Sequence, residues 1–195
     1  ASSGNTAPCL GTEPAGQDRY YGRDAAAING SLTKIGGSAG TPSGQPNGFD
    51  YTKISNSGNA LPASTALGSG PNDWACTRDN VTGLLWEVKT LTPGSPGLRD
   101  VTNSYNWYDP NPATNGGDAG STGTATSCNN TLAACNTHDY VIAVNAASLC
   151  GRSDWRLPSY RDAFTLFNAQ TLGAVSPTPF DATYFLLSGN VMFTS

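Results

Sequence analysis

The chain has 195 residues, of which 12% are Asp, Glu, Lys or Arg, against about 25% in an average globular protein. This scarcity of charge excludes a bundle of long, charged amphipathic helices. The formal net charge is −4, and the ten basic residues are scattered, so they do not form the basic face that nucleic-acid binding requires. Four Trp, eight Tyr and six Phe supply core material and argue against full disorder.

Cysteine usage and composition predict a secreted or surface protein. The chain is poor in Lys and rich in Asn, Ser, Thr and Gly, and cysteines in such proteins usually pair. We expect Cys128–Cys135 to close a short loop and Cys9–Cys76 to tie down the N-terminal part. Because the number of cysteines is odd, this pairing leaves Cys150 alone.

The ends of the sequence and its apolar runs bear on location. Residues 1–4 have no basic or apolar signal-peptide region, and we interpret them as a mature terminus after signal removal. The longest apolar runs, around residues 140–147 and 184–187, are far shorter than the ~18 residues of a membrane span. We therefore expect an extracellular or cell-surface protein without a membrane span.

Residues 1–71 are dominated by Gly, Ser, Thr, Asn and Pro. Short aromatic patches such as Tyr20-Tyr21 interrupt them, and linkers rarely carry aromatic residues. The pattern predicts a loop-rich N-terminal arm packed on a main domain of residues 72–195. A disordered linker is the alternative.

A β-hairpin is the first regular element that the sequence predicts. Residues 74–78 form one strand, residues 79–83 supply turn chemistry, and residues 84–88 form the second strand. Alternation places Trp86 on one face of the second strand and Glu87 on the other.

Two helices follow. Thr137 is placed to cap a helix over residues 138–149, with Tyr140 and Val144 on one face and Gly151 as its stop.

Ser159 and Asp162 resemble a capping box at the start of a second helix, residues 160–170, which we expect to bury Phe164 and Phe167. Residues 184–187 and 191–194 have the pattern of two last strand pieces. Short strands, two helices and much ordered loop predict an α+β fold.

Two segments carry recognisable signatures. Residues 77–87, Thr-Arg-Asp-Asn-Val-Thr-Gly-Leu-Leu-Trp-Glu, resemble an Asp-x-x-Thr-Gly-Leu-x-Trp motif. Residues 150–159, Cys-Gly-Arg-Ser-Asp-Trp-Arg-Leu-Pro-Ser, resemble an Asp-Trp-Arg-Leu-Pro-Ser/Thr motif. In this order they resemble the Lcl C-terminal domain family, named after a domain of a collagen-like bacterial adhesin. The resemblance covers about residues 72–195.

This resemblance implies a C-type-lectin-like fold, related in shape to formylglycine-generating enzymes and phage receptor-binding variable proteins. Family members are mostly bacterial envelope or secreted proteins, and the named member binds sulfated glycans. The sequence departs from the family at Ala163, where Leu is usual, and at Ser195, after which members usually continue with further strands. We therefore expect a domain that lacks its last strands and a partner for Cys150 beyond them.

The residues of the two signatures are of types that stabilise a fold rather than carry out a reaction. Trp86 and Trp155 are large enough to anchor the core, and Asp79 is placed to bond the amides of its own turn. Arg156 points away from Trp155 in an extended segment, so we expect it to be buried or half-buried and paired with Asp79 or Asp154. A ligand-binding Arg156 is the alternative.

Catalytic motifs are weak. Residues 36–40 match Gly-x-Ser-x-Gly by letters, but the Thr-Pro-Ser-Gly that follows is not the helix a nucleophile elbow needs. A zinc site on Cys128, Cys135 and His138 lacks a clear fourth ligand. The chain contains two glutamates, which leaves little for paired-carboxylate hydrolysis. We expect no enzymatic activity.

The loop of residues 105–118 is the best candidate surface. Its aromatic side chains suit stacking on sugar rings, and its side-chain oxygens are the hard ligands that calcium prefers. The alternative is that the polar residues are ordinary turn formers and the aromatic residues belong to the core. The candidate contacts are Tyr105, Trp107 and Tyr108 for a ligand and Asp109, Asn111, Asn115 and Asp118 for Ca²⁺.

Resemblance and composition together favour a carbohydrate-binding adhesin with a polysaccharide partner and, at most, Ca²⁺ as a cofactor. A structural subunit of an extracellular filament or pilus-associated assembly is one alternative, because a sheet without its last strands exposes an edge that a neighbouring chain can pair with. A receptor-binding variable protein is the other.

Overall fold

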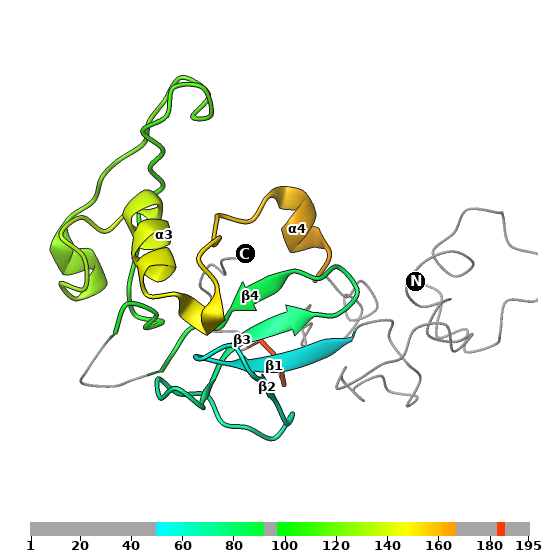
Figure 1. Ribbon diagram of the computed structural model, residues 1–195. Helices are drawn as coiled ribbons and strands as arrows, with labels where there is room; N and C mark the ends of the chain where they lie inside the picture. The colour runs from blue at the N-terminus through cyan, green and yellow to red at the C-terminus, as the bar shows by residue number, and fades with distance from the viewer. Residues whose placement is uncertain (1–49, 92–96, 167–182, 186–195) are drawn as a thin grey trace, which may run out of the picture.

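The structure is a computed structural model that describes residues 50–91, 97–166 and 183–185 (Figure 1). Within these residues a small antiparallel sheet and two helices give the expected α+β class. The elements are the strands β1 (Tyr51–Ser55), β2 (Ala60–Leu61), β3 (Trp74–Asp79) and β4 (Leu85–Glu87), the helices α3 (Thr137–Ala146) and α4 (Tyr160–Phe164), and the short 3₁₀ turns η1 (Ala125–Cys128) and η2 (Leu149–Gly151).

The sheet has the strand order β2-β1-β3-β4, with every pair antiparallel. Strands β1 and β2 come from the part of the chain that we expected to form an arm, and β1 pairs along the whole length of β3. The rest of that arm, residues 1–49, lies outside the described residues. The predicted hairpin of residues 74–88 is confirmed as β3 and β4.

The turn of this hairpin is built by Asp79. Its Oδ1 accepts a hydrogen bond from the Val81 N–H (3.0 Å) and its Oδ2 accepts one from the Thr82 hydroxyl (2.8 Å). Gly83 has φ +79°, a conformation that favours glycine. The first signature is therefore turn chemistry, as predicted.

Both faces of β4 are buried, because the sheet lies between two apolar clusters. Leu85 packs in the cluster under α3, and Trp86 packs in the cluster on the opposite face. Glu87 is only 1% exposed. The first cluster includes Ile54, Cys76, Leu85, Tyr140, Val144, Leu149 and Trp155, and the second contains Tyr51, Trp86, Leu166, Tyr184 and Phe185.

Helix α3 differs from its prediction at both ends. Its N-cap is Asn136, whose side chain accepts from the Asp139 N–H (2.8 Å), and the Thr137 hydroxyl accepts instead from the Tyr108 N–H (3.1 Å). The helix ends at Ala146, before Leu149, because Ser148 takes a left-handed φ of 49°.

Helix α4 begins with the predicted capping box of Ser159 and Asp162. It is shorter than predicted, and its Phe164 is 59% exposed, so the expectation that Phe164 is buried is wrong. Phe167 and the predicted strand of residues 191–194 lie outside the described residues. Tyr184, from the other predicted strand piece, is buried, and its carbonyl accepts from the Thr77 hydroxyl (2.8 Å).

Two disulfides cross-link the fold. Cys128–Cys135 is confirmed, whereas Cys76 pairs with Cys150, so the predicted Cys9–Cys76 bond and the isolated Cys150 are both wrong. The reason is that η2 places Cys150 against β3, with a Cα–Cα distance of 6.4 Å to Cys76. Cys9 lies outside the described residues. No helix in the described part of the chain has the length and apolar character to cross a membrane.

Candidate functional site

Most of the predicted binding surface, residues 105–118, falls in a hairpin-shaped loop of residues 107–121, hereafter the aromatic loop. Its two sides are joined by a bridge between Tyr108 and Gly120, by a hydrogen bond from the Asp109 N–H to the Ala119 carbonyl (3.0 Å), and by a third bond from Ser121 back to residue 107. In Figure 1 the loop projects beyond α3.

The four predicted calcium ligands all form local turns within the aromatic loop. In each case one side-chain oxygen accepts a hydrogen bond from the backbone N–H two residues later, at 2.9–3.0 Å. Bonds from Thr114 and Asn111 hold the pKa of Asp109 below its usual range. No group of three or more His, Cys, Asp or Glu suited to a metal occurs among the described residues. Calcium binding by Asp109, Asn111, Asn115 and Asp118 stays a prediction.

The three predicted aromatic contacts lie in different environments. Tyr105 faces the core: its ring centroid lies 4.7 Å from that of Tyr140, its hydroxyl donates to the Leu98 carbonyl (2.7 Å), and burial raises its pKa. Tyr108 is half-buried, with its ring edge-on to His138 at 6.2 Å. Trp107 is 48% exposed.

The exposed indole of Trp107 is held in place by the opposite side of the loop. The Trp107 carbonyl accepts from the Ser121 N–H (3.0 Å). A Cβ on Gly120, which has φ +75°, would lie 2.6 Å from the Trp107 ring atom Cε3. Only glycine fits this approach, so the backbone at position 120 packs directly against the indole.

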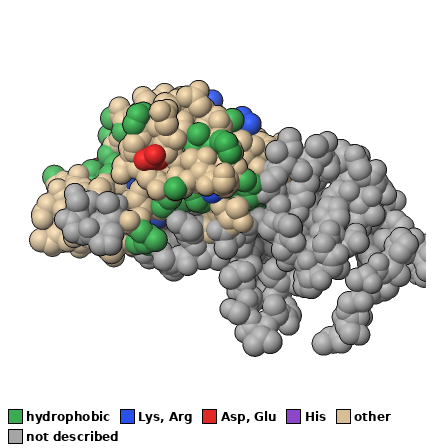
Figure 2. Space-filling view, turned by 90° about the horizontal axis from the view of Figure 1, so that it is seen from below, with side chains coloured by type: hydrophobic (Ala, Val, Ile, Leu, Met, Phe, Trp, Pro, Cys, Tyr) green, Lys and Arg blue, Asp and Glu red, His purple; other side chains and the backbone are tan. Residues whose placement is uncertain are grey.

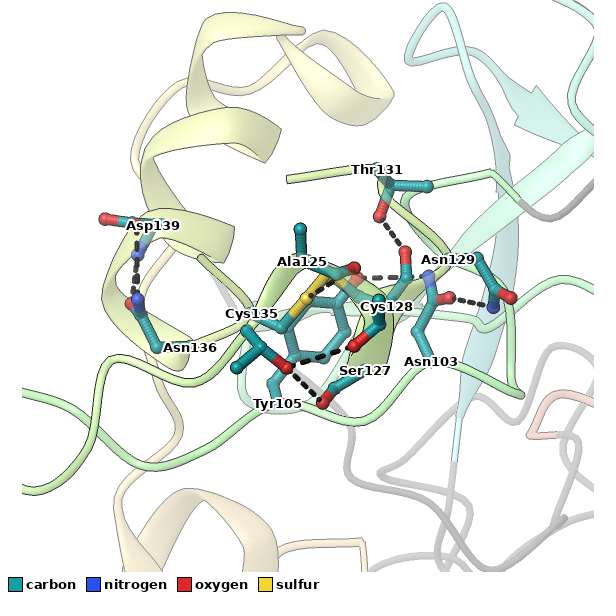
Figure 3. Close-up of a disulfide and its surroundings, with 12 residues drawn as sticks. Asn103, Tyr105, Ala125, Ser127, Cys128, Asn129, Thr131, Cys135, Asn136 and Asp139 are labelled. Carbon is teal, nitrogen blue, oxygen red and sulfur yellow. Dashed lines mark hydrogen bonds between the residues drawn. A yellow bond between two sulfur atoms is a disulfide. The ribbon is translucent and has the colours of Figure 1, made fainter. Parts of the chain in front are cut away.

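The Cys128–Cys135 disulfide supports the base of the aromatic loop (Figure 3). The Cys135 carbonyl accepts from the Asn106 N–H (3.0 Å), which fixes the residue that precedes Trp107. Asn103 donates to the Tyr105 hydroxyl (3.1 Å) on the same side. Disulfide and hydrogen bonds thus position the loop on a rigid base.

Arg156 bonds to residues outside the aromatic loop. Its guanidinium donates to Asp162 (2.7 Å), and its side chain is 49% exposed. This bond raises the pKa of Arg156 and lowers that of Asp162. The predicted partners, Asp79 and Asp154, are wrong, because Asp79 serves its own turn and Asp154 pairs with Arg152 at 2.7 Å.

A buried polar network lies under α3, and the sequence prediction missed it. The Tyr140 hydroxyl donates to Glu87 (2.5 Å), and the Lys89 ammonium lies 3.1 Å from Glu87 Oε1 and 3.0 Å from the Tyr140 hydroxyl. Burial lowers the pKa of Lys89 and raises that of Tyr140. Alternation along the strand places Glu87 and Lys89 on one face, and this was the only local sign of the network. The third member, Tyr140, is 51 residues away from Lys89 in the sequence.

Comparison with known proteins identifies one family. The model of the Lcl C-terminal domain matches residues 75–192, which is more than half of the chain and contains both signatures. No curated protein and no solved structure matches the sequence.

Proposed function

The chain belongs to the Lcl C-terminal domain family, and from this premise we propose that it is a secreted or cell-surface bacterial adhesin that binds carbohydrate. With it we infer the C-type-lectin-like fold, with which the small antiparallel sheet and two helices are compatible. Two disulfides support an extracellular location, because such bonds persist in oxidising compartments.

The observation that carries this proposal is the fixed, exposed indole of Trp107. Aromatic rings present a large, stiff apolar surface at low entropic cost, which suits the C–H face of a sugar ring. The neighbouring residue Asn106 donates its side-chain amide to the Ser121 hydroxyl (3.2 Å), so the loop also carries polar groups of the kind that bond sugar hydroxyls. A rigid loop lowers the ordering cost of binding.

Charge favours a neutral glycan. The chain has a net charge of −4, and Arg152 and Arg156, the exposed cations of the second signature, are each paired with a carboxylate. Among the described residues, the face shown in Figure 2 displays mainly backbone and uncharged side chains, with few charged ones. A sulfated polymer would find both of these arginines already paired with a carboxylate.

Binding of the full chain to a panel of neutral polysaccharides tests the proposal. We expect Trp107→Ala to weaken binding about tenfold, which corresponds to roughly 1.4 kcal/mol of lost contact. Tyr160→Ala is the matched control, because Tyr160 is an aromatic residue that is 80% exposed on α4. The proposal fails if the unmodified chain binds none of the polysaccharides, or if the two variants lose affinity equally.

A further inference from the structure

A hollow of about 370 Å³ lies beside the C-terminal end of α3, and no predicted site residue contributes to it. Its lining combines the apolar side chains of Leu98, Val144, Ala147 and Leu149 with the hydroxyl residues Ser69 and Thr90. A mainly apolar lining with a few polar groups is the usual composition of a small-molecule site.

Thr90 is the unusual member of this lining. It is only 6% exposed, and its backbone is fully used: its N–H donates to the Arg99 carbonyl and its carbonyl accepts from the Val101 N–H, both at 2.9 Å. Its hydroxyl makes no hydrogen bond to a described residue and is not fully enclosed, and Thr90 is one of the residues that line the hollow. A hydroxyl in this position lacks a partner that a ligand can supply.

Arg99 also lines the hollow, but its bonds prevent it from clamping an anion. One terminal nitrogen donates to the carbonyls of Ala75 (3.0 Å) and Val88 (2.8 Å), and the other donates to the Asn56 side chain and the Gly68 carbonyl (both 3.3 Å). The forked donor that recognises carboxylate or sulfate is therefore already committed to the protein. Arg99 instead holds Thr90 through its backbone carbonyl, and an uncharged ligand suits the lining better than an anion.

We propose that this hollow binds one neutral pyranose ring, as a second contact point that rests on the proposed carbohydrate-binding function. The volume lies at the low end of the range for ligand sites, about 300–1,000 Å³, which suits one ring and not a chain. The C–H face of the sugar packs on Val144 and Leu149, and a sugar hydroxyl bonds the Thr90 hydroxyl.

Titration of the isotope-labelled full chain followed by NMR tests this site. The probes are glucose, galactose, mannose and N-acetylglucosamine, with glucuronate as the anionic comparison. We expect at least one neutral sugar to shift the amide signals of Thr90, Val144 and Ala147 in a saturable way. Glucuronate is expected to bind more weakly than glucose.

Three variants sharpen the test. Ala147→Trp puts a bulky side chain at a lining position and should abolish the shifts. Ala146→Trp, at the neighbouring exposed position of α3 that does not line the hollow, should leave them unchanged. Thr90→Val keeps the shape of the side chain, removes the hydroxyl and should weaken binding about tenfold.

The proposal is overturned if no neutral sugar shifts these amides up to its solubility limit, if glucuronate binds more tightly than glucose, or if both Trp variants behave alike. Polysaccharide binding that depends on Trp107 distinguishes the two proposals. If that binding persists without sugar in the hollow, the proposed function stands and only the second contact point falls.

Discussion

At the scale of single residues, one carboxylate of the first signature and one just after the second act on nearby backbone. Asp79 accepts from the Val81 N–H two residues ahead, and Asp162 accepts from the Ser159 N–H three residues behind (2.7 Å). Both interactions are local, so the residue types and spacing predicted them. The partner of Arg156 was not predicted correctly. Several carboxylates were candidates, and the sequence does not say which one folds against an arginine in an extended segment.

Replacing Asp162 by Ala should destabilise the protein by about 0.5–2 kcal/mol, the usual cost of a lost helix cap. The carboxylate joins the cap of α4 to Arg156, and the variant loses both. Asp154→Ala is the control, because its exposed pair with Arg152 contributes about 0–1 kcal/mol. Urea unfolding measures the free energy of unfolding of both variants. An equal loss in the two would show that the cap of α4 adds no stability.

Asp162 should also make the stability of the protein depend on pH. Its folded pKa is lowered by Arg156 and by the Ser159 cap, so the folded state holds the proton less tightly than the unfolded state. The contribution of Asp162 is therefore complete above the unfolded pKa of about 3.9 and is lost as the pH falls below it. The stability difference between the parent chain and Asp162→Asn should shrink between neutral pH and pH ~3; a difference that grows would contradict the assignment.

The buried network under α3 can be tested by replacing Tyr140, whose hydroxyl bonds both Glu87 and Lys89. Tyr140→Phe leaves Glu87 and Lys89 without the hydroxyl between them, and an unsatisfied buried polar group costs about 1–3 kcal/mol. Tyr108→Phe is matched in chemistry, and the Tyr108 hydroxyl makes no hydrogen bond to a described residue, so its effect should stay within about 0.5 kcal/mol. Thermal unfolding of both variants distinguishes a network from simple aromatic packing.

At the scale of elements, local signals predicted more than long-range ones. The β3–β4 hairpin, the capping box of α4 and the core face of α3 all depend on residues within a few positions of one another, and the structure contains them. The early end of α3 was missed, because left-handed Ser148 carries no recognisable sequence mark. Exposure of Phe164 was missed because periodicity indicates an apolar face and does not say what covers it.

The two disulfides should differ in how much they stabilise the fold. Cys76–Cys150 spans 74 residues and Cys128–Cys135 spans seven, and a longer loop loses more entropy when it is closed in the unfolded chain. We expect the double variant Cys76→Ala, Cys150→Ala to lose about 4 kcal/mol and the other double variant about 2–3 kcal/mol. Urea unfolding without reductant measures this order, and the reverse order would mean that the aromatic loop's base matters more than the β3–η2 link.

At the scale of the whole molecule, the sequence predicted where to look but not which residues face outward. The loop of residues 105–118 was chosen for its composition, and folding divides its residues: Tyr105 turns into the core, and Trp107, in the aromatic loop, stays outside. The hollow beside α3 was not predictable, because its lining comes from five separate stretches between Asn56 and Leu149. Sites assembled in this way have no local pattern.

The net charge of the whole chain leads to the last prediction, the salt dependence of glycan binding. Charge-driven binding to a polyanion weakens steeply with salt, because surface charges are screened over about 10 Å at 0.1 M and about 3 Å at 1 M. The chain carries −4, the two arginines of the second signature are each paired with a carboxylate, and Arg99 is committed to protein oxygens, so the proposed recognition relies on stacking and neutral hydrogen bonds. Affinity for a neutral polysaccharide should therefore change less than about twofold between 0.1 and 1 M NaCl. Heparin serves as the comparison: tight binding to heparin at low salt that disappears at 1 M NaCl would place recognition on a basic surface and contradict the neutral-glycan assignment.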